Sequence, residues 1–135
     1  MRQIPLLLLG LSLPVLLSAC VTCPEYIEVT YDAGGTPVVT PDSCSARVGT
    51  TITWRGPASD QTPFTLRFEG DPGSVEKGGP PRDRRSRVST SSSLEVESES
   101  GPYQEVVITA ENTGDYKYDV EANGHVLDPH IIIEK

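Results

Sequence analysis

Short stretches in which polar and apolar residues alternate recur along the chain from residue 25 to its end. A period of two is typical of strands that bury one face. The predicted strands cover residues 25–31, 36–40, 50–55, 63–68, 94–98, 104–110, 116–121, 126–127 and 131–133. No segment shows a period near 3.6. The pattern therefore predicts an all-β domain of seven to nine short strands, which suits a β-sandwich.

The last part of the chain, residues 114–135, is expected to contain two strands folded on a tight turn. Asn123-Gly124 is the strongest short hairpin signal in the sequence. A type I′ turn needs positive φ at both central positions, and Asn-Gly is a preferred pair there. Tyr116, Tyr118 and Val120 precede the turn on one face, and the apolar run 131–133 ends the chain. These strands are expected to be central in the sandwich.

Residues 70–93 differ in composition and are rich in Gly, Pro, Ser and charge. Such a segment buries little apolar surface, so we expect a long exposed loop. It carries a basic patch formed by Arg82, Arg84, Arg85 and Arg87. The patch could bind a partner or an anion such as an acidic polysaccharide or lipopolysaccharide phosphate. The alternative, a solvated loop whose arginines pair with Glu95, Glu97 and Glu99, is favoured because charge runs are usually solvated.

The N-terminus does not belong to the predicted domain. Residues 4–17 form an apolar run that is too short to cross a bilayer, which needs about 20 residues, and suits a secretory signal peptide. Leu17-Ser18-Ala19-Cys20 resembles the bacterial lipobox, in which a cysteine follows the cleavage site. The resemblance implies a signal peptide of residues 1–19 and a lipidated Cys20, carrying acyl chains such as palmitate. An ordinary signal peptide with a chance cysteine is the alternative.

The remainder divides into a short tether, residues 20–24, and the sandwich, residues 25–135. Val21, and not Asp, follows Cys20; by resemblance to Gram-negative lipoproteins this implies an outer-membrane protein that faces the periplasm. The formal net charge of −8 becomes −9 when Arg2 is removed with the signal peptide. Such an acidic surface repels nucleic acid. The anchored domain is expected to meet the membrane through its lipid and an unidentified protein or envelope partner.

Two further cysteines, Cys23 and Cys44, remain in an exported protein. An oxidising compartment favours a disulfide between them. Closing a loop of this length stabilises by roughly 3 kcal/mol on the chain-entropy model. Two free thiols or a metal pair are the alternatives, but no other soft ligand lies nearby in the sequence.

Two separated motifs resemble the cupredoxin family. The segment from Gly49 to Trp54 (GTTITW), followed by Pro63-Phe64-Thr65-Leu66, is similar to a strand pair in that family, and Gly114-Asp115-Tyr116-Lys117-Tyr118 is similar to the strand that leads to its copper loop. The resemblance implies a cupredoxin-like Greek-key β-sandwich.

The same resemblance implies that the blue copper ligands are absent. A blue copper site uses two His, one Cys and a weak axial Met. The first His falls on Phe64 and the Cys on Val120, while the neighbouring Asp119 cannot replace a thiolate. The tight Asn123-Gly124 turn stands where the copper loop would lie, and the only methionine is Met1. We expect no cofactor.

His125 and His130 are the only histidines. Around a turn they could belong to a copper or zinc site, with help from Asp119 or Asp128, but alternation along a strand would put them on opposite faces. Two surface histidines are the favoured interpretation.

No catalytic motif stands out: the serines of residues 86–93 have no neighbouring His and no GxSxG pattern. The sequence therefore predicts a non-enzymatic, lipid-anchored binding or structural module of the cell envelope. The alternative is a periplasmic metal-binding or redox protein with a non-standard site at His125 and His130.

Overall fold

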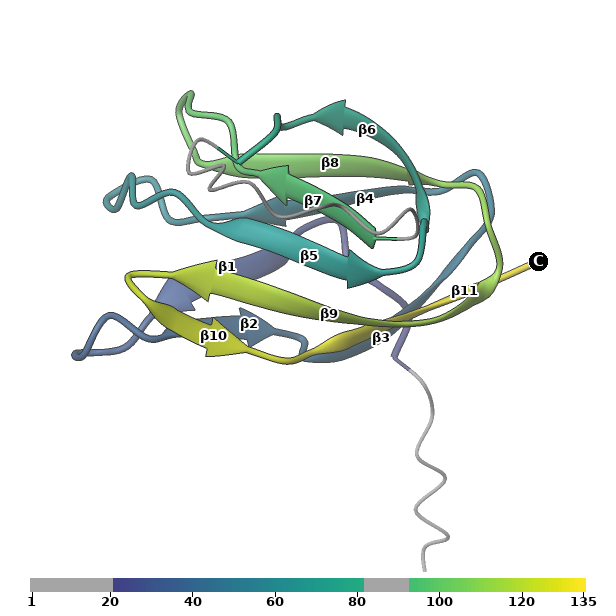
Figure 1. Cartoon of the computed structure of the whole chain (residues 1–135), viewed down its shortest axis with the longest axis horizontal. Coiled ribbons are helices and arrows are strands. Elements are labelled where there is room, and N and C mark those ends of the chain that lie inside the picture. The colour runs from purple at the N-terminus through teal and green to yellow at the C-terminus, as the bar shows by residue number, and fades with distance from the viewer. Residues whose placement is uncertain (1–20, 82–92) are drawn as a thin grey trace, which may run out of the picture.

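The computed structural model describes residues 21–81 and 93–135 (Figure 1). These residues form two stacked β-sheets. The strands are β1 (Ile27–Tyr31), β2 (Pro37–Thr40), β3 (Ser43–Arg47), β4 (Thr51–Arg55), β5 (Thr65–Glu69), β6 (Gly73–Lys77), β7 (Ser93–Glu97), β8 (Glu105–Ala110), β9 (Gly114–Ala122), β10 (His125–Leu127) and β11 (His130–Glu134). Within these residues, no helix is long and apolar enough to cross a bilayer.

One sheet has the order β2-β1-β4-β8-β6, and the other has the order β3-β11-β9-β5-β7 with β10 paired to β9. Most neighbours are antiparallel, but β1 runs parallel to β4, and β3 runs parallel to β11. The chain changes sheets between β2 and β3, and the Thr40-Pro41 peptide bond in this connection is cis. The prediction of an all-β sandwich is confirmed, with eleven strands in the described residues where the pattern indicated seven to nine.

The predicted inward faces fill the space between the sheets. Trp54, Phe68 and Tyr118 form its aromatic centre, where Phe68 stacks on Tyr118 and Trp54 meets both rings edge-on. Aliphatic side chains surround them; Ile27, Leu66, Ile108 and Ile131 are all at most 1% exposed. Alternation along each strand puts these residues on one side, so the polar residues between them face outward.

The closing hairpin has the predicted geometry. Asn123 and Gly124 have φ values of 53° and 76°, as a type I′ turn requires. β9 and β11 are paired, and both lie inside their sheet, so the expectation of central strands at the C-terminus is confirmed.

Two strands were not predicted. β3 has the sequence SCSAR, which contains no branched or aromatic residue, and its pairing with β11 is long-range. β6 lies inside the segment expected to be an exposed loop, so that expectation is wrong for Gly73–Lys77. The strand forms at the edge of its sheet because Gly73 lets the backbone approach β8 closely: an added Cβ would lie 1.8 Å from the Thr109 carbonyl oxygen.

The described part of the predicted tether, residues 21–24, is fastened to the domain. The amide of Ser45 donates a 2.8 Å hydrogen bond to the Val21 carbonyl, and the amide of Cys23 donates one of 2.8 Å to the Ser45 carbonyl. Thr22 forms a parallel bridge with Ser45. Residues 21–23 therefore lie along β3 as part of the domain and are not a free tail.

Candidate functional site

The positions that the cupredoxin resemblance assigns to copper ligands lie in the apolar core. Phe64, immediately before β5, and Val120 on β9 are both 0% exposed. Neither side chain offers an imidazole or a thiolate, and Asp119 beside Val120 is half-buried. The residues present therefore do not fit a blue copper centre.

The hairpin that stands in place of a copper loop is tied to the neighbouring turn. The Asn123 side-chain amide donates a 3.0 Å hydrogen bond to the carbonyl of Gly35, between β1 and β2. Within residues 21–81 and 93–135, no three His, Cys, Asp or Glu residues gather as metal ligands would.

The two histidines are held apart by the strand register. His125 is exposed and pairs with Ala122, whereas His130 is half-buried and pairs with Lys117. The two partners are five positions apart on β9, about 16 Å at 3.3 Å per residue. An odd separation also puts them on opposite faces of the strand, as the sequence indicated. This register does not bring both imidazoles to one metal ion.

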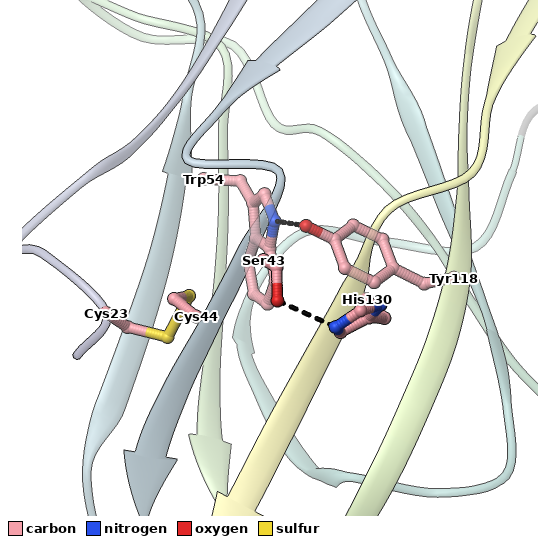
Figure 2. The surroundings of a disulfide bond; sticks show 6 residues. All are labelled: Cys23, Ser43, Cys44, Trp54, Tyr118 and His130. Carbon is pink, nitrogen blue, oxygen red and sulfur yellow. Dashed lines mark hydrogen bonds between the residues drawn. A yellow bond between two sulfur atoms is a disulfide. The ribbon is translucent and has the colours of Figure 1, made fainter. Parts of the chain in front are cut away.

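His130 has a different partner that the sequence did not reveal. Its Nε2 lies 2.7 Å from Ser43 Oγ, and the two residues are opposite each other on parallel strands β11 and β3 (Figure 2). They are 87 positions apart in the chain, so no local signal could have paired them. The prediction of two surface histidines therefore holds for His125 but needs correction for the half-buried His130.

Ser43 and His130 line a small hollow of about 150 Å³, together with Asp42, Leu127, Asp128 and Pro129. Asp119 on β9 is close enough to feel the charge of Asp128 in this hollow: burial first, and then the Asp128 carboxylate, raise the pKa of Asp119. A nucleophilic serine needs a base that is itself oriented by a third group. In the described chain the hydrogen bonds of His130 do not include a carboxylate, so the pair is not a catalytic triad.

A wider depression of about 650 Å³ lies at one end of the sandwich. It is lined by Val48, Glu111, Asn112, Thr113 and Lys135. It offers no histidine or cysteine, and it adds no catalytic pair.

The predicted disulfide between Cys23 and Cys44 is present, with the two Cα atoms 4.8 Å apart (Figure 2). It joins residues 21–23 to β3 by a covalent bond in addition to the backbone hydrogen bonds. The start of the described chain is thus held at one fixed place on the domain. Cys20, the predicted lipid site, lies just outside the described residues.

The arginine patch of residues 82, 84, 85 and 87 also lies outside the described residues. Glu95, one of the expected partners of that patch, is bound by Arg67, whose Nε lies 2.8 Å from the carboxylate. Arg67 also reaches Glu121 at 3.0 Å. This network crosses β7, β5 and β9 on the outer face of their sheet.

A second charged cluster, which sequence patterns did not indicate, lies on the opposite sheet. The Arg55 guanidinium stacks on Tyr26 at 3.5 Å and on Tyr103 at 4.3 Å, and it contacts Glu105 at 2.9 Å. Lys77 binds the other oxygen of Glu105 at 2.9 Å. Cation–π contacts of this kind hold the residues before β1 and the loop before β8 against β4.

Comparison with known proteins gives little beyond the architecture. No protein-family model matches the chain, and no curated protein matches it. The chain is similar to the solved structure of a pseudoazurin from Sinorhizobium meliloti, with 18% identity and a TM-score of 0.32 over 82% of this chain and 74% of that chain. A similarity at this level carries no conclusion about function. The β-sandwich is established by the two sheets themselves, and the finer cupredoxin relationship stays a prediction.

Proposed function

We propose that this protein is a lipid-anchored module of the bacterial cell envelope, held on its membrane by acyl chains on Cys20. Its copper-free, cupredoxin-like sandwich binds or supports a partner and does not catalyse a reaction. The observation that carries the proposal is the fastening of the chain to β3 from Val21 onward, directly after the lipobox cysteine.

This fastening suits a lipid anchor at Cys20 better than an ordinary signal peptide, whose removal would leave no anchor. Two backbone hydrogen bonds and the Cys23–Cys44 disulfide hold residues 21–23, so a lipid on Cys20 would be joined to a rigid support. Each buried methylene of an acyl chain contributes about 0.8 kcal/mol, and several chains on one cysteine give a stable anchor. The domain would then be held at the membrane surface with no linker between them.

The disulfide supports an exported location. Disulfides persist in oxidising compartments such as the periplasm and are rare in the cytosol. Cys44 is 2% exposed and packs in the core, so this bond is part of the folded domain.

A non-enzymatic role is supported by the chemistry of the residues at the family's metal site. The ligand positions carry Phe64 and Val120, which cannot bind copper, and both are buried in the core. Polar side chains outside the core form hydrogen bonds between strands, as Ser43 on β3 and His130 on β11 do. A partner would therefore bind the outer surface of the domain.

The anchoring is tested by mass spectrometry of the mature N-terminal peptide from membrane fractions. We expect the mature chain to begin at Cys20 and to carry acyl chains, and the N-terminal peptide of Cys20→Ala to carry none. Cys23→Ala is the matched control, because it removes a cysteine three positions away and should keep the lipid. A mature chain that begins elsewhere, or a Cys20→Ala variant that still carries acyl chains, would refute the proposal.

The choice of membrane is tested at the next residue. Val21 stands where a Gram-negative inner-membrane lipoprotein would have Asp. We expect fractionation to place the natural protein in the outer membrane and Val21→Asp in the inner membrane, while Val21→Ile should stay in the outer membrane. Equal distribution of all three would contradict the outer-membrane assignment.

A further inference from the structure

Exposed large hydrophobic residues are unevenly distributed over the described surface. They are Val21, Val38, Val48, Val75 and Val126. All but Val75 belong to one border of the molecule, which we call the anchor edge. It consists of residues 21–23, β2, β3 with the adjoining Val48, and β10.

The strand order makes this border continuous. β2 ends one sheet, β3 ends the other, and the chain passes directly between them. β10 lies against β2, and residues 21–23 lie along β3. In Figure 1 these elements form the lower border of the molecule, where the described chain begins. β6 and β7, the opposite ends of the two sheets, lie away from it.

Each valine is substantially open to solvent. Val21 is 57% exposed and Val126 is 56% exposed, while Val38 and Val48 are each 43% exposed. Single exposed valines are ordinary on a soluble surface. Here their position matters, because the predicted lipid site at residue 20 is one Cα step, about 3.8 Å, from Val21.

The charges near this border argue for a lipid surface held by the covalent anchor and not by electrostatic attraction. Arg47 and Lys135 are exposed near Val48, but Asp42 and Asp128 line the hollow between β3 and the β10–β11 connection. Anionic headgroups would be repelled by these carboxylates and by the acidic domain as a whole. A zwitterionic surface is the better match for exposed valines on the two sides of this border, where Val38, opposite Thr30, faces outward from one sheet and Val126, opposite Glu121, faces outward from the other.

We propose that the anchor edge lies on the bilayer, with Val38, Val48 and Val126 in the headgroup region and with β6 and β7 directed away. This orientation rests on the proposed lipidation of Cys20. The short and doubly fastened connection supports this orientation: hydrogen bonds with Ser45 and the disulfide fix residues 21–23 on β3, so the proposed lipid site directly adjoins the anchor edge. A partner would then meet the edge formed by β6 and β7.

The orientation is tested with single tryptophan probes in the mature lipidated protein. Val38→Trp and Val126→Trp place the probe on the anchor edge, and Val75→Trp on β6 is the matched control, since Val75 is 37% exposed and Val38 is 43% exposed. The native Trp54 is 1% exposed and supplies a constant background. Each protein is reconstituted into phosphatidylcholine vesicles, with or without a nitroxide quencher on the lipid headgroup.

We expect the nitroxide lipid to cause a loss of emission from Val38→Trp and Val126→Trp and to leave Val75→Trp unchanged. Equal quenching at all three sites, or stronger quenching at Val75→Trp, would overturn the orientation. Vesicle flotation is measured on the same samples to separate the two proposals. Protein that floats without the expected contrast refutes the orientation alone, whereas protein that does not float refutes the anchoring as well.

Discussion

The indole N–H of Trp54 donates a 3.1 Å hydrogen bond to the phenol oxygen of Tyr118, and this bond joins the two sheets through the core (Figure 2). Trp54 belongs to β4 and Tyr118 to β9, so the bond pairs the only strongly polar atoms in the aromatic centre. A buried donor without a partner costs the free energy of its lost hydration. The pair therefore fixes how the sheets are stacked as well as filling space.

Tyr118→Phe should keep the ring packing and leave the Trp54 N–H without its acceptor. We expect it to lower the free energy of unfolding by about 1–3 kcal/mol, as for other unsatisfied buried donors. Urea unfolding followed by Trp54 fluorescence measures the change. Tyr103→Phe, at a half-buried surface site, is the control and should change stability by less than about 0.5 kcal/mol. Equal effects of the two variants would show that the buried bond contributes nothing.

The domain should lose stability in alkali because of the same residue. Burial first, and then the Asp42 carboxylate, raise the pKa of Tyr118 to about 12, although the Trp54 hydrogen bond acts in the opposite direction. An unfolded tyrosine ionises near pH 10. The stabilising contribution is therefore complete below pH 10 and is lost as the pH rises from 10 towards 12.

This loss amounts to as much as about 1.4 kcal/mol per pH unit for one group. Unfolding free energies of the natural protein and Tyr118→Phe between pH 8 and pH 11.5 measure it, since other titrating groups are common to both. The variant should show the shallower decline. Parallel curves would contradict the assignment.

Removal of the Cys23–Cys44 bond should destabilise the domain and free its N-terminal segment. The bond closes a loop with a sequence separation of 21, for which the chain-entropy model gives about 3 kcal/mol. The double variant Cys23→Ala/Cys44→Ala and the reduced natural protein should both unfold at lower urea concentrations. Exchange of the backbone amide hydrogens at position 23 and at Ser45 should become faster in both. Unchanged protection of these amides would mean that the backbone hydrogen bonds suffice.

Acid should weaken the cluster around Glu105. Burial alone would raise the pKa of this carboxyl, but hydrogen bonds from Lys77 and Arg55 and their positive charges outweigh it, and the pKa is lowered from 4.5. The resulting stabilisation is present above about pH 4.5 and is lost as the pH falls through the lower folded pKa.

Glu105→Gln should cost at least about 1 kcal/mol at pH 7, because hydrogen bonds to a charged group are stronger than neutral ones. The difference from the natural protein should shrink as the pH approaches 3. Glu28→Gln, on the exposed face of β1, serves as the control and should have little effect. A difference that stays constant with pH would rule out the ionic contribution.

Copper should not bind stoichiometrically to the folded domain. A soluble form that begins at residue 20 with Cys20→Ala is titrated with Cu(II), and bound metal is counted after desalting. We expect no blue absorption band and no retained equivalent of copper, since the register separates His125 from His130. One retained equivalent that disappears in His125→Ala/His130→Ala would instead establish the alternative metal-binding function.

The strands that could be predicted are those whose signal is local. Alternation at Thr51–Arg55, Thr65–Glu69 and Glu105–Ala110 follows from the period of two, and the Asn123-Gly124 turn follows from its need for positive φ. The cysteine pair could also be predicted, because few pairings were open in an exported chain. Each of these conclusions depends on residue type and spacing alone.

The tertiary structure decided which strands become neighbours. β3 and β6 have little strand propensity and exist because β11 and β8 offer them backbone partners. The contact between Ser43 and His130, and the hold of Ser45 on residues 21–23, join parts of the chain whose register is set by packing of the whole sandwich. The sequence by itself determined which face of each predicted strand is buried, because alternation along a strand is local. Only closure of the two sheets determined that the proposed lipid site adjoins an edge bearing exposed valines.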